Sequence, residues 1–291
     1  MRGAGRTHDR AQLGVAARRG RRSLRGKAVR RLLFLAAGAA LAVAAADRPL
    51  KVLILTGETD IPGHDWRATT GKIREILESS GRFQAAAAEK VPGLKERDLR
   101  GFHALVLNYN GPRWGQETER AVERFVKSGG GFISLHGVTY GVFYGQEKVN
   151  NRWQASSKGD KGWTAYPDLI GATWKPENIG HGARHQFSVR WVARDHPIAQ
   201  GLPETFLADD ELYHRLDLRP HVKVLAVAYS DPKTRGTGKD EPIIWCAPFG
   251  KGRTVHITLG HDVKAWSQPG VGTALLRSVE WAAAGRVSPP R

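Results

Sequence analysis

A glycine-rich turn at residues 129–131 separates two segments that constrain the fold more than any other part of this chain. Residues 116–127, before the turn, place apolar side chains at helical spacing. Residues 131–135, after the turn, form a short apolar run that ends at His136 and Gly137. A helix that leads through a tight turn into a buried strand is typical of folds in which helices cover a parallel sheet.

The same alternation recurs along the rest of the chain. Continuous apolar runs predict buried strands, and apolar residues at helical spacing predict the helices between them. We expect strands at 50–55, 83–87, 103–107, 131–135, 186–192 and 222–228, a hairpin of 243–247 with 253–259, and helices at 66–80, 116–127 and 273–284. The sequence therefore predicts an α/β fold with a mostly parallel central sheet and helices on both faces, formed by residues 47–291 as one domain.

His136 lies where a predicted strand ends, at a corner that Gly137 allows to turn sharply. Ligands of open α/β sheets bind at the carboxyl ends of the strands, so a titratable side chain at this corner is a candidate for chemistry. An imidazole there can act as a general base or as a metal ligand. We expect His136 at the floor of the main pocket, with another histidine or an acid within reach.

Further polar clusters follow other predicted strands or lie in loops. They are His64 with Asp65, His181 and His185 within residues 180–185, Asp210 and Glu211 within residues 208–213, and His261 with Asp262. Imidazoles and carboxylates that meet at one sheet edge can bind Zn²⁺ or share acid and base roles. Each residue also has a structural interpretation: Asp65 as a helix N-cap, Asp210 as a turn residue, and each histidine as a local hydrogen-bonding group. The spacing of His181 and His185 fits one helix face, but Gly182 indicates a loop.

The long segment 138–183 breaks the regular pattern and contains several aromatic residues, among them Tyr140, Trp153, Trp163 and Trp174. Aromatic faces can stack on sugar rings. Alternatively, the same side chains pin the segment to the domain. Because the segment follows His136 directly, we expect it to pack over the carboxyl edge of the sheet as a wall or lid.

The pattern of residues 1–46 predicts an export signal. An arginine-rich stretch is followed by the apolar run 32–45 and by small residues at 44–46, which suit a signal peptidase. We expect cleavage near Asp47, export to the periplasm or the extracellular space, and no stable membrane span afterwards. An uncleaved N-terminal anchor is the alternative, and the paired Arg30 and Arg31 leave both Sec and twin-arginine export open.

The distribution of charge argues against a nucleic-acid partner. The formal net charge is +17, but residues 1–46 alone contribute +10, so the remaining 245 residues carry only +7. No basic stripe with interleaved aromatic residues stands out. The single cysteine, Cys246, lies in an apolar run and excludes both an internal disulfide and a cysteine-based zinc site.

Several short motifs, in this order, give the chain a resemblance to the ThuA-like (trehalose-utilisation) family. They are residues 51–57 with His64, 129–137, 195–198 with 201–203, 210–213, 242–245, and 250–253 leading to 259–261. The resemblance covers about residues 49–286. It implies a class I glutamine-amidotransferase-like fold, which is a flavodoxin-type three-layer sandwich. True amidotransferases carry a nucleophilic cysteine at the corner where this chain has His136, so amidotransferase chemistry is not expected.

The resemblance also implies a carbohydrate substrate. Our leading hypothesis is a secreted enzyme that acts on a disaccharide or a (keto-)glycoside by hydrolysis, elimination or isomerisation, with acid/base or metal-assisted chemistry. The expected catalytic residues are His136, His64, Asp210 and Glu211; the expected substrate-binding residues are Tyr140, Trp163, His181 and Asn110; His136 and His185 are the expected ligands if a divalent metal such as Zn²⁺ is used. The alternative is a non-catalytic carbohydrate-binding or accessory protein. Convergence of these histidines and acids favours the enzyme, whereas dispersal beside an aromatic groove favours the binding protein.

Overall fold

The computed structural model describes residues 48–59, 63–139, 141–150, 152–173 and 180–289. The predicted export segment lies outside these residues, as do Tyr140 and Trp174. From Pro49 onward the chain forms one compact unit. Within the described part of the chain, no helix is long and apolar enough to cross a membrane.

A nine-stranded mixed sheet forms the centre of the molecule, with the strand order β10-β9-β13-β14-β15-β4-β3-β1-β2. The strands are β1 (Leu50–Leu55), β2 (Phe83–Ala88), β3 (Ala104–Leu107), β4 (Gly131–Leu135), β9 (His185–Trp191), β10 (Thr205–Asp210), β13 (Lys223–Tyr229), β14 (Asp240–Phe249) and β15 (Gly252–Ile257). Strands β2, β1, β3, β4 and β15 pair in parallel. Strands β15, β14, β13, β9 and β10 pair antiparallel. The predicted strands are all present, and their parallel half carries the edge where His136 lies.

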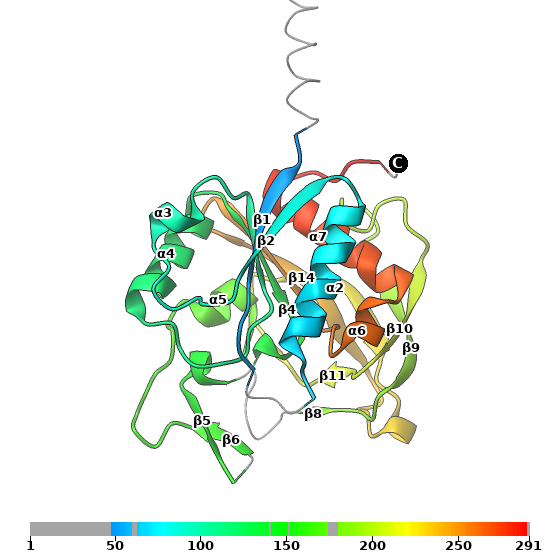
Figure 1. Ribbon diagram of the computed structural model, residues 1–291. Helices are drawn as coiled ribbons and strands as arrows, with labels where there is room; N and C mark the ends of the chain where they lie inside the picture. The colour runs from blue at the N-terminus through cyan, green and yellow to red at the C-terminus, as the bar shows by residue number, and fades with distance from the viewer. Residues whose placement is uncertain (1–47, 60–62, 140, 151, 174–179, 290–291) are drawn as a thin grey trace, which may run out of the picture. The chain divides into compact units, whose positions relative to one another are not determined.

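Helices cover both faces of the sheet (Figure 1). On one face lie α2 (Trp66–Ser79), α6 (Val263–Trp266) and α7 (Pro269–Ala284), and on the other lie α3 (Glu96–Leu99), α4 (Gln116–Lys127) and α5 (Tyr166–Ile170). Successive residues of β1 alternate between the two apolar cores: Val52 and Ile54 pack on the first face, Leu53 and Leu55 on the second. This two-sided burial explains why the strand reads as a continuous apolar run, and it confirms the predicted three-layer sandwich.

Local sequence sets where the helices begin. The side chain of Asp65 caps α2 by accepting hydrogen bonds from the backbone N–H groups of Arg67 and Ala68, which is the structural role considered for it. Helix α7 begins at Pro269, four residues before the predicted start. Proline suits the first turn of a helix because it lacks the N–H that would have no partner there.

The segment after His136 is more ordered than its composition indicates. It contains the 3₁₀ turns His136–Thr139 and Val142–Tyr144, the hairpin of β5 (Gln146–Val149) with β6 (Arg152–Ala155), helix α5 and β7 (Ala172–Thr173). Phe143, Trp163 and Tyr166 bury their rings in the core under α4. The aromatic residues therefore pin this segment to the domain. Its hairpin lies at the carboxyl end of the parallel strands (Figure 1). The predicted wall or lid is not seen in the described residues, because Val138 is the one residue of the segment among them that lines the cavity beside His136.

Candidate functional site

His136 directly follows β4 and has the backbone angle φ +48°, a left-handed conformation that is rare for residues other than glycine. Its side chain is only 4% exposed. Nδ1 donates a hydrogen bond of 2.8 Å to the carbonyl oxygen of Thr258, just beyond β15. Because a carbonyl can only accept, the proton is fixed on Nδ1, and Nε2 keeps its lone pair. The strained corner thus presents one defined tautomer at the carboxyl end of the sheet.

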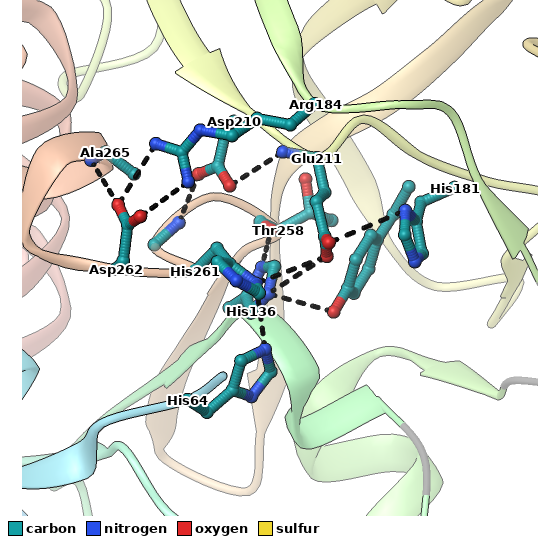
Figure 2. A network of polar contacts seen from close by, with 12 residues as sticks. His64, His136, His181, Arg184, Asp210, Glu211, Thr258, His261, Asp262 and Ala265 are labelled. Carbon is teal, nitrogen blue, oxygen red and sulfur yellow. Dashed lines mark hydrogen bonds and ion pairs between the residues drawn. The ribbon is translucent and has the colours of Figure 1, made fainter. Parts of the chain in front are cut away.

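Three further side chains meet at His136 (Figure 2). His64 follows β1, Glu211 follows β10 and His261 follows β15. The distance from His64 Nε2 to His261 Nδ1 is 3.0 Å. Glu211 Oε2 lies 3.3 Å from His261 Nδ1 and 3.8 Å from His136 Nε2. We call these four residues the histidine–glutamate cluster; one nitrogen or oxygen atom from each lies within 4.8 Å of the others.

The environment shifts the pKa values of the three imidazoles in different directions. Burial, with the charge of His261 as a second cause, lowers the pKa of His64 to about 4. Burial also holds the pKa of His136 well below its usual value, and the neighbouring His64 adds to this. In contrast, the hydrogen bond with Glu211 raises the pKa of His261. The cluster therefore keeps two neutral imidazoles beside a third that pairs with a carboxylate.

Asp210, predicted as a catalytic acid, does not face the cluster. It is completely buried, and its two oxygens accept hydrogen bonds from the backbone N–H groups of Glu211, at 2.8 Å, and Gly260, at 2.6 Å. Burial raises the pKa of its carboxyl to about 7. Because Glu211 and His261 are carried on these two backbone segments, Asp210 positions the site and does not line it.

Ion pairs between charged side chains lie next to Asp210. Arg184 donates hydrogen bonds to the carboxylates of Asp209 and Asp262, and Asp262 in turn caps α6 through the backbone N–H of Ala265 (Figure 2). These ion pairs tie the loop after β15 to β10. They therefore hold His261 in place from the side away from the cluster.

Two predicted substrate-binding residues lie at the margin of the site. Nδ1 of His181 is 3.8 Å from Glu211 Oε1 and also bonds the carbonyl of Gly182. The side-chain amide of Asn110 donates to the carbonyl of Gly137.

Tyr213 was not singled out from the sequence, yet its hydroxyl lies 3.0 Å from His136 Nε2. Its position at the end of the polar cluster 208–213 could have marked Tyr213 as a site residue, because it lies three residues beyond Asp210.

Other predictions are corrected by the structure. Trp163 is 4% exposed, and its indole N–H donates to Glu123 at 2.6 Å, so it is a core residue and not a sugar platform. A large apolar ring gains more from burial than from a place on the surface. His185 bonds the carbonyl of Ala183 and packs its ring against Phe187, and it is not one of the four cluster residues. His261 takes the position that the sequence analysis gave to His185. Tyr140 lies outside the described residues.

Among the described residues, the cavity beside His136 has a volume of about 30 Å³. A larger cavity of about 410 Å³ lies at the other end of β3 and β4, around His103. The small cavity opens between the ends of β1, β3, β4 and β15. It is lined by His64, His136 and His261 together with Glu58, Trp66, Asn108 and Asn110.

Fold and site together define the class of protein: a flavodoxin-type α/β sandwich with a histidine–carboxylate cluster at the carboxyl end of its parallel strands. The model of the ThuA family, described as trehalose utilisation, matches residues 51–282. The chain belongs to this family, and the family description links it to carbohydrate use. No curated protein matches the chain.

Solved structures share the fold of this chain. A ThuA-like protein from Parabacteroides merdae is 28% identical, with a TM-score of 0.69 over 84% of this chain and 93% of that one. A ThuA-like protein from Bacteroides uniformis is 17% identical, with a TM-score of 0.60 over 81% and 93%. A β-galactosidase from Rahnella sp. R3 is 17% identical, with a TM-score of 0.52 over 83% of this chain and 32% of that enzyme, which shows a shared fold alone.

Proposed function

We propose that this protein is an enzyme that acts on a disaccharide or glycoside, or on its keto form, by hydrolysis, elimination or isomerisation. The observation that carries the proposal is the convergence of three imidazoles and one carboxylate from four separate chain segments. The family description supplies the substrate class. Each of these reactions requires a proton to be moved at the sugar, and imidazoles and carboxylates do this directly or through a cation that they hold.

The residues beside the cluster suit a polar substrate. Asn108 and Asn110 bring side-chain amides to the cavity, Glu58 brings a carboxylate, and Trp66 brings an aromatic ring. Amides and carboxylates can bond sugar hydroxyls, and an aromatic face can cover the C–H side of the ring. A purely binding protein would rely on an exposed aromatic platform. Trp163 is buried and cannot be that platform, so it does not support the binding alternative.

The experiment is a turnover screen with disaccharides, simple glycosides and their keto derivatives, with product release followed by chromatography. His136→Ala should lower turnover by about 10²–10⁴-fold, because removal of a catalytic base or ligand has this effect. His221→Ala changes an exposed histidine outside the cluster and is the matched control. Binding of a sugar without turnover of any substrate would support the binding protein. Full activity of His136→Ala would refute the proposed site.

The proposal includes export. If residues 1–46 form a cleaved signal, then the enzyme works on sugars outside the cytoplasm and the mature chain begins near Asp47. N-terminal sequencing of native protein checks this. A native N-terminus within the arginine-rich stretch would contradict cleavage.

A further inference from the structure

We propose that His64, His136, Glu211 and His261 form a binding site for one divalent transition-metal cation of the Zn²⁺ type. The site does not depend on the identity of the sugar. The argument rests on the spacing of the four side chains, on the tautomer of His136, on the charge of the cluster and on the chemistry of its donor atoms.

The spacing fits one shared ion. Zn²⁺ binds imidazole nitrogen and carboxylate oxygen at about 2.0–2.2 Å, and tetrahedral geometry then places neighbouring ligand atoms about 3.4 Å apart. Three separations in the histidine–glutamate cluster are 3.0, 3.3 and 3.8 Å. They lie on both sides of the tetrahedral value, and all four donor atoms lie within 4.8 Å of one another. A single ion can therefore contact all four with small side-chain adjustments.

His136 is prepared as a ligand. Its Nδ1 proton is held by the carbonyl of Thr258, so Nε2 carries the lone pair toward the cluster (Figure 2). The Tyr213 hydroxyl, 3.0 Å from Nε2, donates to this lone pair and would have to turn away when a cation binds. Metal-binding histidines almost always donate their other N–H to a carbonyl or carboxylate, because this fixes the ring and raises its basicity.

In the described part of the chain, the ion-pair partners of Glu211 are three histidines and no lysine or arginine. They are His136, His181 and His261. The nearest arginine in the network, Arg184, is engaged by Asp209 and Asp262. The side chain of Glu211 is 18% exposed, and a partly buried carboxylate is stabilised by a neighbouring positive charge. A bound cation would compensate Glu211 and at the same time use the imidazole lone pairs that face it.

The donor set selects the kind of metal. Three imidazole nitrogens with one carboxylate oxygen suit Zn²⁺ and related transition metals, whereas Ca²⁺ and Mg²⁺ prefer sites built from oxygen. Asp210 supports the set from behind, because it holds the backbone N–H groups of Glu211 and Gly260 together. The donor set therefore favours Zn²⁺ or a related transition metal, held where β1, β4 and β15 end.

The test is a titration of the full chain, without an affinity tag and after chelator treatment, with Zn²⁺ in competition with a chromophoric chelator. We expect one equivalent to bind with a dissociation constant of about 1 µM or tighter and to raise the Tm. His64→Ala and Glu211→Gln should each weaken binding by about 10–100-fold or more. His185→Ala is the control and should bind as the native protein does. Circular dichroism checks that each variant is folded, and His64→Ala changes a half-buried loop residue.

Two results would overturn the proposal. The first is native protein that binds no more Zn²⁺ than the double variant His64→Ala, Glu211→Gln. The second is loss of binding in His185→Ala. Sugar turnover by native protein that binds no Zn²⁺ would overturn the metal site and leave the proposed enzyme activity intact. Conversely, tight Zn²⁺ binding without turnover of any sugar would support the metal site and refute the proposed function, so the two failures are distinguishable.

Discussion

Strands β4 and β15 carry two polar clusters, and the contrast between them shows what makes a histidine available for chemistry. At the strand ends lie His136 and His261. Deeper in the same pair of strands, Ser134 and His256 form a hydrogen bond of 2.7 Å between Oγ and Nδ1. Ser134 is 0% and His256 1% exposed, and the ring of His256 lies 4.5 Å from that of Trp245.

The residue types are similar, but the surroundings differ. His256 is sealed inside the sheet, and its Nε2 has no hydrogen-bond partner among the described residues. Burial alone lowers its pKa to about 3. His136 is also buried, yet its Nε2 faces Tyr213, Glu211 and a cavity. A histidine within the strand is therefore held neutral by its packing, whereas a histidine at the strand end meets groups from other segments.

Substitution of Asp210 should have the largest effect on this contrast. Asp210→Ala leaves two buried N–H groups without their acceptor, which costs about 1–3 kcal/mol of unfolding free energy for each group. Because these groups position Glu211 and His261, turnover should fall as well. Denaturant unfolding and the turnover assay measure both effects. Loss of stability with unchanged turnover would show that Asp210 does not position the site.

The pair inside the sheet should affect stability only. Ser134→Ala removes the partner of His256 and should lower the unfolding free energy by about 1–3 kcal/mol, with no change in turnover. The double variant Ser134→Ala, His256→Leu replaces both partners by apolar groups and should recover part of the loss. A large loss of turnover in folded Ser134→Ala would remove the distinction between the two clusters.

The last expected effect concerns pH, and it is small near neutrality. His256 has a folded-state pKa of about 3, below its usual value of 6.5. Below pH 6.5 the unfolded chain therefore binds a proton at this residue that the folded chain does not. Stability should fall with decreasing pH between about 6.5 and 3, by up to about 1.4 kcal/mol per pH unit for this residue. Unfolding of His256→Leu should show a shallower pH dependence than native protein, and an equal slope would contradict the assignment.

The strands of the sheet could be predicted from the sequence because strands buried on both faces consist of continuous apolar runs, which solvent-facing segments do not need. Sequence reasoning predicted His64, His136 and Glu211 as site residues because polar side chains at strand ends are visible in a sequence. It did not separate Asp210 from Glu211, since neighbouring residues of an extended chain point to opposite sides and only the packing decides which side is the site. It assigned Trp163 to the surface and preferred His185 to His261. Local sequence patterns do not indicate which way a loop runs across the sheet edge, so they could not show which side chains reach the site.

The four cluster residues also tie the site to the completion of folding. His64 and His261 are in contact although 197 positions separate them in the chain. The parallel strands that bring them together include β15, one of the last strands to leave the ribosome. A truncated chain that ends before β15 lacks His261 and cannot hold the complete cluster. Binding of the cation, or turnover, would therefore indicate that nearly the whole sheet has formed. Either measurement would follow global folding, whereas a local spectroscopic probe follows only its own surroundings.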